Sequence, residues 1–196
     1  MALGREAIVR TALGLLDEVG LEGLTLRRLA VELDVQAPAI YWHVRNKAEL
    51  LEAMAATIFD DALADLESPR RGESWIEWTA ETAHRLRAAV LSYRDGARVV
   101  AGGYRAHAGG RPLELALRAL CDAGFPVRDA ARGITAIHSY VQGFTLEEQT
   151  TTAAPPVDPE RHPLAASAHA DLADQDARFD HGLRLLLSGL RLSRFA

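Results

Sequence analysis

Residues 25–44 read TLRRLAVELDVQAPAIYWHV, and this stretch predicts two short helices joined by a tight turn. Thr25 is a good N-cap, because its hydroxyl can accept a hydrogen bond from a free backbone N–H, and apolar residues follow it at helical spacing. The pattern restarts after Asp34 and Val35, with Pro38 near the first turn of the second helix, where a missing N–H costs nothing. The stretch therefore has the pattern of a helix-turn-helix.

The second of these helices carries an unusual exposed face. Its inward face is formed by Ile40 and Val44, four residues apart. The side chains left on its other faces are those of Ala39, Tyr41, Trp42 and His43. A helix-turn-helix offers its second helix to the DNA major groove, and aromatic rings are an odd choice for a face that only meets water. An ordinary helical hairpin is the alternative, and the spacing favours DNA binding over it.

The composition is that of a globular protein. Of the 196 residues, 48% are hydrophobic and 25% are charged, a balance that excludes an intrinsically disordered chain. No run of 18 or more apolar residues occurs, and the first residues, MALGRE, do not resemble a signal peptide. We therefore expect a cytoplasmic protein with no membrane contact. The single cysteine, Cys121, cannot form an internal disulfide.

The net charge of −5 argues against nonspecific coating of nucleic acid, but its distribution is uneven. Residues 1–47 hold six basic and six acidic residues, so the whole negative excess lies in the rest of the chain. The basic residues that bracket the two short helices, where phosphates would pass, are Arg27, Arg28, Arg45 and Lys47. Charge by itself thus permits a local DNA-binding surface without requiring one.

Residues 1–46 are expected to form the helix-turn-helix domain. An amphipathic helix over 5–19 completes a three-helix head with the two short helices. A connecting helix is predicted over 47–66, with Asn46 as its cap. Lys47, in the first turn of that helix, opposes the helix dipole unless a phosphate lies at the same N-terminus.

Residues 67–196 are predicted to form a larger, helical domain. Helices are expected over 74–93, between the glycines at 96 and 102, from 111 to 123, over 127–149, near 164–174 and from 179 onward. Four of the eight prolines fall in residues 150–163, a composition typical of a flexible linker.

The apolar pattern of the last of these helices indicates that it packs against a partner. Residues 179–190, FDHGLRLLLSGL, are apolar over more than one face, so the helix needs burial on several sides. A second copy of the chain can supply the missing wall. We expect a homodimer built on this helix and on the helix over 127–149.

Several motifs carry a resemblance to a known family. The segments LTLRRLA at 24–30 and AIYWHVRNKAELL at 39–51 closely resemble the DNA-binding head of TetR-type transcriptional repressors. In the body, the segments GESW at 72–75, YRDGARV at 93–99, GFPVRD at 124–129 and LEEQ at 146–149 resemble the effector domain of the tetracycline-repressor branch. The resemblance implies an all-α fold, in which a three-helix DNA-binding head is joined to a larger helical ligand-binding and dimerisation domain.

The resemblance also implies roles for residues of the head, namely phosphate contacts from the aromatic residues and Lys47, and a guanine contact from Arg27. The expected DNA-binding residues are Thr25, Arg27, Arg28, Ala37, Pro38, Ala39, Tyr41, Trp42, His43 and Lys47. The alanines beside Pro38 replace polar residues that this branch places at the start of its recognition helix. Alanine can touch a thymine methyl but cannot hydrogen-bond a base, so a different operator is expected.

The effector site departs further from the branch that it resembles. Tetracycline repressors hold their drug as a magnesium chelate with a histidine ligand, and this chain has Val100 at that position. Valine offers magnesium no ligand atom, so we expect no metal site and no cofactor. The pocket is predicted to be more apolar, and its candidate residues are Leu63, Trp75, Thr82, Leu86, Val100, Tyr104, Ala116, His138 and Glu147.

Glu147 admits two interpretations. His138 and Glu147 are nine residues apart and so lie on opposite faces of one helix, where they cannot form a paired metal or acid–base site within a chain. Glu147 is either a surface residue beside Glu148 or a contact to the pocket of the partner subunit.

The expected function is that of a ligand-responsive transcriptional repressor. It would bind a palindromic operator in double-stranded DNA as a homodimer and be released by a small, largely apolar or aromatic effector. An activator or a ligand-blind regulator of the same fold is one alternative. Another is a small helical enzyme using His84, His107 or His138 near Glu147, but no nucleophile–base spacing, metal motif or phosphate-binding loop supports it. We therefore expect no enzymatic activity.

Overall fold

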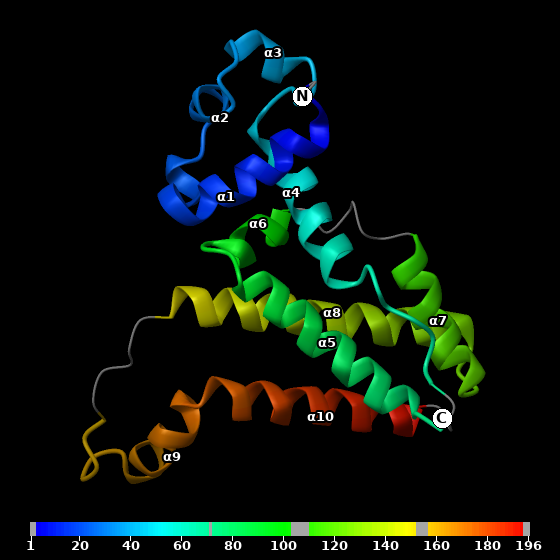
Figure 1. The fold of residues 1–196 in the computed structure, drawn as a ribbon. Helices are drawn as coiled ribbons and strands as arrows, with labels where there is room; N and C mark the ends of the chain where they lie inside the picture. Colours follow the sequence, from blue (N-terminus) through cyan, green and yellow to red (C-terminus); the bar gives the residue numbers. More distant parts are fainter. Residues whose placement is uncertain (1–2, 71, 103–109, 152–156, 194–196) are drawn as a thin grey trace.

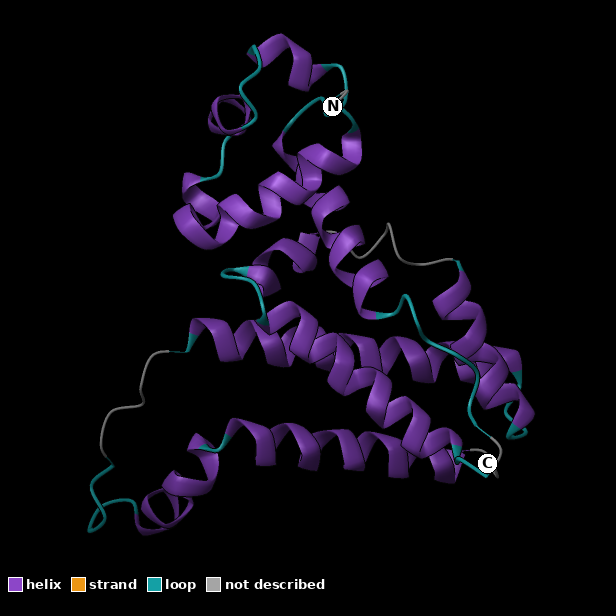
Figure 2. Ribbon diagram, viewed as in Figure 1, coloured by secondary structure: helices purple, strands orange, loops and turns teal. Residues whose placement is uncertain are grey.

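A computed structural model describes residues 3–70, 72–102, 110–151 and 157–193 of the chain. Over these residues the fold consists of ten helices with no strand, as Figure 2 shows. Within the same ranges, no helix is both long and apolar enough to cross a lipid bilayer. The all-helical architecture agrees with the prediction from the sequence.

Four helices build the upper part of the molecule in Figure 1. They are α1 (Arg5–Gly23), α2 (Leu26–Glu32), α3 (Ala37–Tyr41) and α4 (Lys47–Ala62). The first three form a head on the upper end of α4, which continues down into the body (Figure 1). The head and α4 share one hydrophobic core, which also takes in Val90, Val99 and Val100 from the body. Because one core spans both parts, α4 is held by the head at one end and by the body at the other.

Six further helices form the body. They are α5 (Trp75–Leu91), α6 (Gly96–Gly102), α7 (Arg111–Asp122), α8 (Val127–Thr150), α9 (Pro163–Ala173) and α10 (Gln175–Ser193). The long helix α8 packs against α5, α6, α7 and α10, and α9 extends beyond the end of this bundle (Figure 1). The segment expected as a linker thus gives its first residue, Thr150, to α8 and its last, Pro163, to α9.

Local side-chain caps explain where several of these helices begin. The side-chain oxygens of Thr25 and Asn46 accept hydrogen bonds from backbone N–H groups three residues later, at 3.2 and 2.9 Å. Ser74 and Glu77 form a reciprocal capping box at the start of α5. At the end of α1, Gly20 has a φ of 68°, which interrupts the regular helix before its last turn.

Arg87 ties the three long helices of the body together. From α5 its guanidinium reaches Glu148 on α8, at 2.6 Å, and Asp176 on α10, at 2.7 Å. The same guanidinium lies 4.9 Å from the ring centroid of Phe179. The Arg87 side chain is largely buried, so loss of one carboxylate partner would leave a charge poorly paired.

A second set of contacts fixes the head on the body. The backbone N–H of Leu21, at the end of α1, donates to the Asp95 carboxylate at 2.8 Å, and Arg94 N–H donates to Asp17 at 2.7 Å. Behind this turn, the Gln149 side chain of α8 accepts from the Ala97 N–H and donates to the Tyr93 carbonyl, at 2.9 Å each. The turn that precedes α6 is thereby held between the end of α1 and the end of α8.

Candidate nucleic-acid interface and ligand cavity

The helix pair α2–α3 buries one face and exposes another. Ile40 and Val44 are fully buried in the head core, as the four-residue spacing predicted. Trp42, directly after α3, is 88% exposed, and Tyr41 is 49% exposed. Large rings left in water at the end of a molecule point to a binding surface rather than to a requirement of packing.

Beside these rings, the head has a shallow basic hollow. Its lining residues are Thr25, Leu26, Arg27, Tyr41, Arg45, Asn46 and Lys47. The Lys47 ammonium donates to the Leu21 carbonyl at 2.6 Å, which holds it at the N-terminus of α4. An ammonium carries three protons, so two remain for an anion. Three cationic side chains around a concave surface fit a phosphate group.

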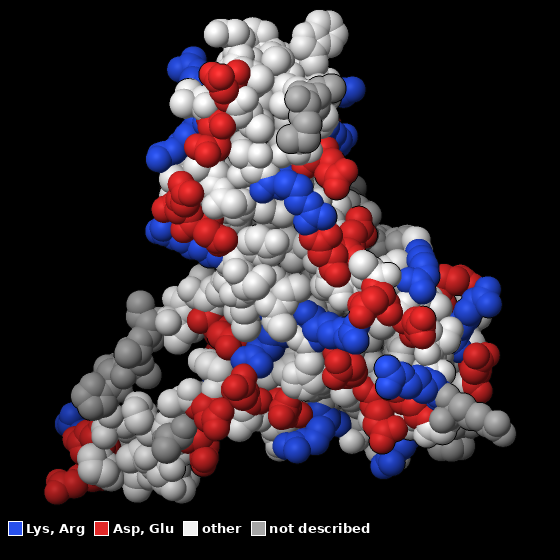
Figure 3. Space-filling view, viewed as in Figure 1, with Lys and Arg blue, Asp and Glu red and all other residues white. Residues whose placement is uncertain are grey.

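The remaining DNA-binding candidates surround this hollow and the tip of the head. Arg27 and Arg28 are exposed in the first turn of α2, and Ala37, Pro38 and Ala39 form the first turn of α3. His43 follows α3 and is partly exposed. In Figure 3 the uppermost surface of the head is mostly uncharged, with basic and acidic side chains lying along its sides.

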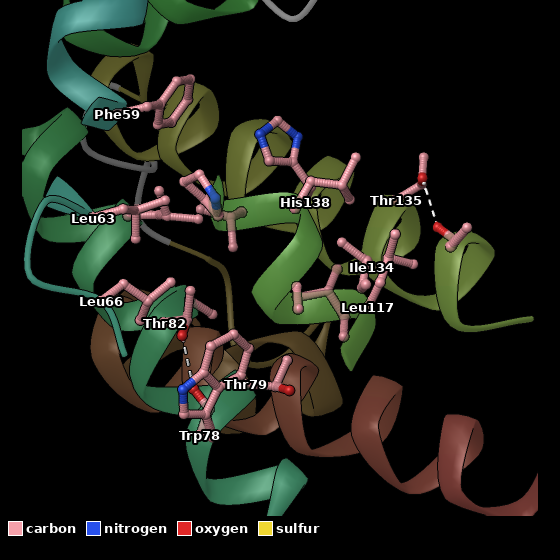
Figure 4. Close-up of a pocket in the computed structure, with 18 of the residues that line it drawn as sticks. Phe59, Leu63, Leu66, Trp78, Thr79, Thr82, Leu117, Ile134, Thr135 and His138 are labelled. Carbon is pink, nitrogen blue, oxygen red and sulfur yellow. Dashed lines mark hydrogen bonds between the residues drawn. The ribbon is translucent and has the colours of Figure 1, made fainter. Parts of the chain in front are cut away.

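The body contains a cavity of about 330 Å³, a volume in the usual range for small-molecule sites. Side chains of α4, α5, α7 and α8 form its wall, together with Leu63 and Leu66, which follow α4 (Figure 4). Most of this wall is aliphatic or aromatic. Polar atoms come from Thr79, Thr82 and Thr135, from His138 and from the exposed Asp60.

Five of the nine predicted effector residues line this cavity, namely Leu63, Thr82, Leu86, Ala116 and His138. Tyr104 lies outside the described residues. Trp75, Val100 and Glu147 do not line it.

Each of these three residues has another environment. Trp75 packs edge-on against Phe125, with ring centroids 5.1 Å apart. Val100 is fully buried in the core shared by the head and α4. Glu147 is half-exposed on α8, and its carboxylate accepts from Arg178 of α10 at 2.6 Å.

Some residues that line the cavity were not predicted from the sequence. Trp78 forms the wall where Trp75 was expected, and Thr79 lies next to it. Phe59 contributes from α4, with its ring 5.7 Å from that of His138. The contribution of Phe59 could not be obtained from spacing along one helix, because it depends on how α4 lies against α8.

The cavity does not fit the magnesium chelate that the tetracycline-repressor branch implies. Val100, at the position of the histidine ligand, has no donor atom and faces the head core. Among the described residues, no three His, Cys, Asp or Glu side chains are grouped so that they could hold a metal ion. The described wall is mostly apolar, and position 100 supplies it with no ligand atom.

Comparison with known proteins identifies the family. The family model described as "Bacterial regulatory proteins, tetR family" matches residues 8–54, and the one described as "Tetracyclin repressor-like, C-terminal domain" matches residues 68–194. The chain belongs to the TetR family. This TetR-family protein is 40% identical over 204 residues to the class C tetracycline repressor of Escherichia coli, covering 98% of this chain and 92% of that protein. The resemblance seen in the head and body motifs is thereby confirmed.

Solved structures of TetR-family proteins share the fold. A TetR variant from Acinetobacter baumannii AYE in complex with minocycline is 36% identical, with a TM-score of 0.80, over 99% of this chain and 96% of that one. BioQ with its double-stranded DNA operator is 32% identical, with a TM-score of 0.71, over 96% and 98%. The predicted all-α TetR fold is confirmed, and the family consists of transcriptional regulators rather than enzymes.

Proposed function

We propose that this TetR-family regulator is a repressor that binds a palindromic operator as a homodimer and is released by a small, largely apolar or aromatic effector. The observation that carries the proposal is the position of α4. Its first turn borders the basic hollow through Lys47, and its last turns line the cavity through Phe59 and Asp60. A molecule in the cavity therefore touches the helix on which the head is mounted.

Two relatives support the two halves of this proposal. One TetR-family structure contains minocycline and another contains an operator duplex, and both match this chain over nearly its whole length. Two heads in one dimer would enter successive major grooves, about one helical turn or a multiple apart. A regulator that binds an operator in this way acts where bacterial DNA lies, in the cytoplasm.

Release requires only a modest coupling between cavity and head. A coupling free energy of about 1–3 kcal/mol changes operator affinity roughly 5- to 150-fold. Effector binding would move α4 against the body and change the separation of the two heads. The contacts of Asp95 with α1 and of Gln149 with the turn before α6 give the head a defined resting position from which such a change can start.

The DNA surface is tested by two matched variants. Arg27→Ala removes a charge beside the hollow, and Arg118→Ala removes one from the exposed side of α7. Operator fragments selected from the intergenic DNA around the gene are titrated at several salt concentrations. We expect Arg27→Ala to weaken binding by about 1–3 kcal/mol, with relaxed base preference or a salt slope smaller by about one, and Arg118→Ala to change neither.

The variant Trp42→Ala extends the same test to the exposed ring that follows α3 in the head. Trp42 is almost fully exposed, so its removal should leave the free energy of unfolding within about 0.5 kcal/mol of the parent value. Operator affinity should nevertheless fall about tenfold or more. Unchanged operator binding in both Arg27→Ala and Trp42→Ala would contradict the proposal, and a reporter gene assayed with and without the regulator distinguishes repression from activation.

A further inference from the structure

The hydroxyl groups in the cavity wall share one hydrogen-bonding arrangement. Each of the three threonines donates its proton to the backbone carbonyl four residues earlier in its own helix. The bonds run from Thr79 to Trp75 at 2.6 Å, from Thr82 to Trp78 at 2.8 Å and from Thr135 to Ala131 at 2.8 Å, and Figure 4 shows the last two. A hydroxyl has one proton and two lone pairs, so each of these groups presents only lone pairs to a ligand.

The indole of Trp78 does not supply a donor either. Its N–H donates to the Glu67 carbonyl at 2.8 Å, so the ring meets the cavity as an apolar surface. The imidazole of His138 can donate or accept and selects neither kind of ligand. The threonine hydroxyls therefore make the cavity rich in acceptors over the described part of its wall.

Over the described part of the cavity wall, the charged side chains have one sign. Among the described lining residues, Asp60 has the only carboxylate, and no lysine or arginine is present. Asp60 is exposed at the edge of the cavity, and no ion pair joins it to another described residue. An exposed carboxylate attracts a cation and repels an anion, with both effects reduced by the water around it.

We propose that the effector is a neutral or cationic molecule with an apolar, aromatic body and hydroxyl or amino groups that donate hydrogen bonds, and that carboxylates are discriminated against. This inference rests on the proposed function, because it assigns a chemical class to the ligand of the same cavity. An acceptor-only group placed against the threonine oxygens would lose its water without gaining a partner, whereas a donor is paired on arrival. The selectivity is thus determined by the helix carbonyls that already hold the hydroxyl protons.

The test uses four naphthalene probes that differ in one substituent and titrates each into the full chain by calorimetry. 2-Naphthol donates, 2-methoxynaphthalene only accepts, 2-naphthylmethylamine is cationic and 2-naphthoate is anionic. We expect naphthol to bind about 2- to 10-fold more tightly than the methoxy compound, the range that one net hydrogen bond gives. The amine should bind about 2- to 10-fold more tightly than the carboxylate, because Asp60 acts on them with opposite sign and its exposure screens both interactions.

Matched variants connect each preference to its residues. Valine at all three cavity threonines keeps the side-chain volume and should remove the preference for naphthol. If that triple variant does not fold, the single variants Thr79→Val, Thr82→Val and Thr135→Val take its place. At least one of them should then reduce the preference for naphthol over the methoxy compound. Thr57→Val is the control, because Thr57 donates to the Ala53 carbonyl at 3.0 Å without lining the cavity. Asp60→Asn should bring the affinities of amine and carboxylate together.

The outcomes separate this inference from the proposed function. Equal or tighter binding of the methoxy compound or of the carboxylate overturns the ligand class and leaves a ligand-responsive repressor in place. Preferences that persist in all the threonine variants and in Asp60→Asn overturn the assignment to these residues. Probes that bind in the expected order without weakening operator binding support the ligand class and count against release by the cavity. Absence of binding by all four probes contradicts both proposals.

Discussion

At the scale of single residues, Asp95 decides how the head meets the body. It has a φ of 57°, a conformation that aspartate and asparagine adopt more readily than most residues. In this conformation its carboxylate accepts from the Leu21 N–H, just after Gly20 has interrupted α1. The Leu21 carbonyl in turn accepts from Lys47. Both polar groups of Leu21 are therefore satisfied by side chains from other parts of the chain.

This contact predicts a pH dependence of stability. The hydrogen bond from the Leu21 N–H lowers the pKa of Asp95 below its usual value of 3.8. Because the folded pKa lies below the unfolded one, the stabilisation is complete above about pH 4 and is lost as the pH falls through the folded pKa. Asp95→Asn, which tolerates the same φ, should cost about 1 kcal/mol near neutral pH and remove this part of the acid sensitivity.

Urea unfolding at pH values from 3 to 7 measures the effect. Asp171→Asn on α9 is the control, because Asp171 is exposed and lies far along the chain from the junction. The interpretation of Asp95 is wrong if the two variants and the parent chain lose stability in parallel on acidification. The sequence predicted a helix boundary at Asp95 and Gly96, but not this contact, because the partner lies 74 residues away.

At the scale of elements, a glycine sets how closely α10 approaches α8. A Cβ at Gly182 would lie 2.2 Å from the Tyr140 hydroxyl oxygen. That hydroxyl donates to the Phe179 carbonyl at 2.9 Å, and burial raises the pKa of Tyr140. The ring of Tyr140 is also stacked on that of Phe179, at 5.4 Å between centroids. The contact requires that α10 present no side chain at Gly182.

Gly182→Ala should therefore destabilise the body despite the better helix propensity of alanine. Displacement of Tyr140 costs the hydroxyl bond and the ring contact, and overpacking of this kind typically costs about 1–3 kcal/mol. Gly14→Ala is the matched control in α1, because a Cβ there meets nothing within 4 Å. It should stabilise the chain by about 0.5–1 kcal/mol. Thermal unfolding of both variants checks the opposite signs, and a stabilised Gly182→Ala variant would refute the close contact.

The sequence predicted where helices begin better than it predicted which side chains of a helix face its neighbours. The side-chain caps at Thr25 and Asn46 placed two helix starts, since a cap acts within one turn of backbone. Trp75 was expected to line the cavity, and in the structure Trp78 lines it instead. Residues three apart lie on neighbouring parts of one helix face, and only the angle at which α5 crosses its neighbours decides which of them reaches the cavity.

At the scale of the whole molecule, one long surface of α10 has no covering element in the described chain. Leu185 is 61% exposed and Leu192 is 70% exposed on this helix, which forms an outer edge of the body in Figure 1. On the same helix, a Cβ at Gly189 would meet nothing within 4 Å. A second copy of the chain would cover these residues in the homodimer that we propose.

Leu185→Glu is expected to break this homodimer. Burying a carboxylate against the partner without a pairing charge is unfavourable, so sedimentation should show monomers at concentrations where the parent chain is dimeric. Affinity for a palindromic operator should fall along with dimerisation, because each head then binds its half-site alone. Val31→Glu, on the exposed face of α2 in the head, introduces the same charge away from both predicted interface helices and should remain dimeric in sedimentation. A dimeric Leu185→Glu variant would place the interface elsewhere.

The family and the helix-turn-helix could be predicted from the sequence, because both depend on residues that are close together along the chain. The cavity was predicted only in part. Val100 was placed in the pocket through the resemblance, but the packing of α6 on α4 turns its side chain into the shared core. How distant helices face one another is a property of the assembled fold and cannot be obtained from spacing along one helix.

The three tryptophans lie in different surroundings, and this gives the protein an optical readout of its own. Trp42 is hydrated at the tip, whereas Trp78 is enclosed in the cavity wall and Trp75 packs against Phe125. Water around an indole shifts its emission to longer wavelengths than hydrocarbon does. DNA binding should therefore alter the long-wavelength side of the tryptophan emission spectrum, where Trp42 emits. Ligand binding in the cavity should alter the short-wavelength side, where Trp78 emits, so both events can be followed in one sample without a dye.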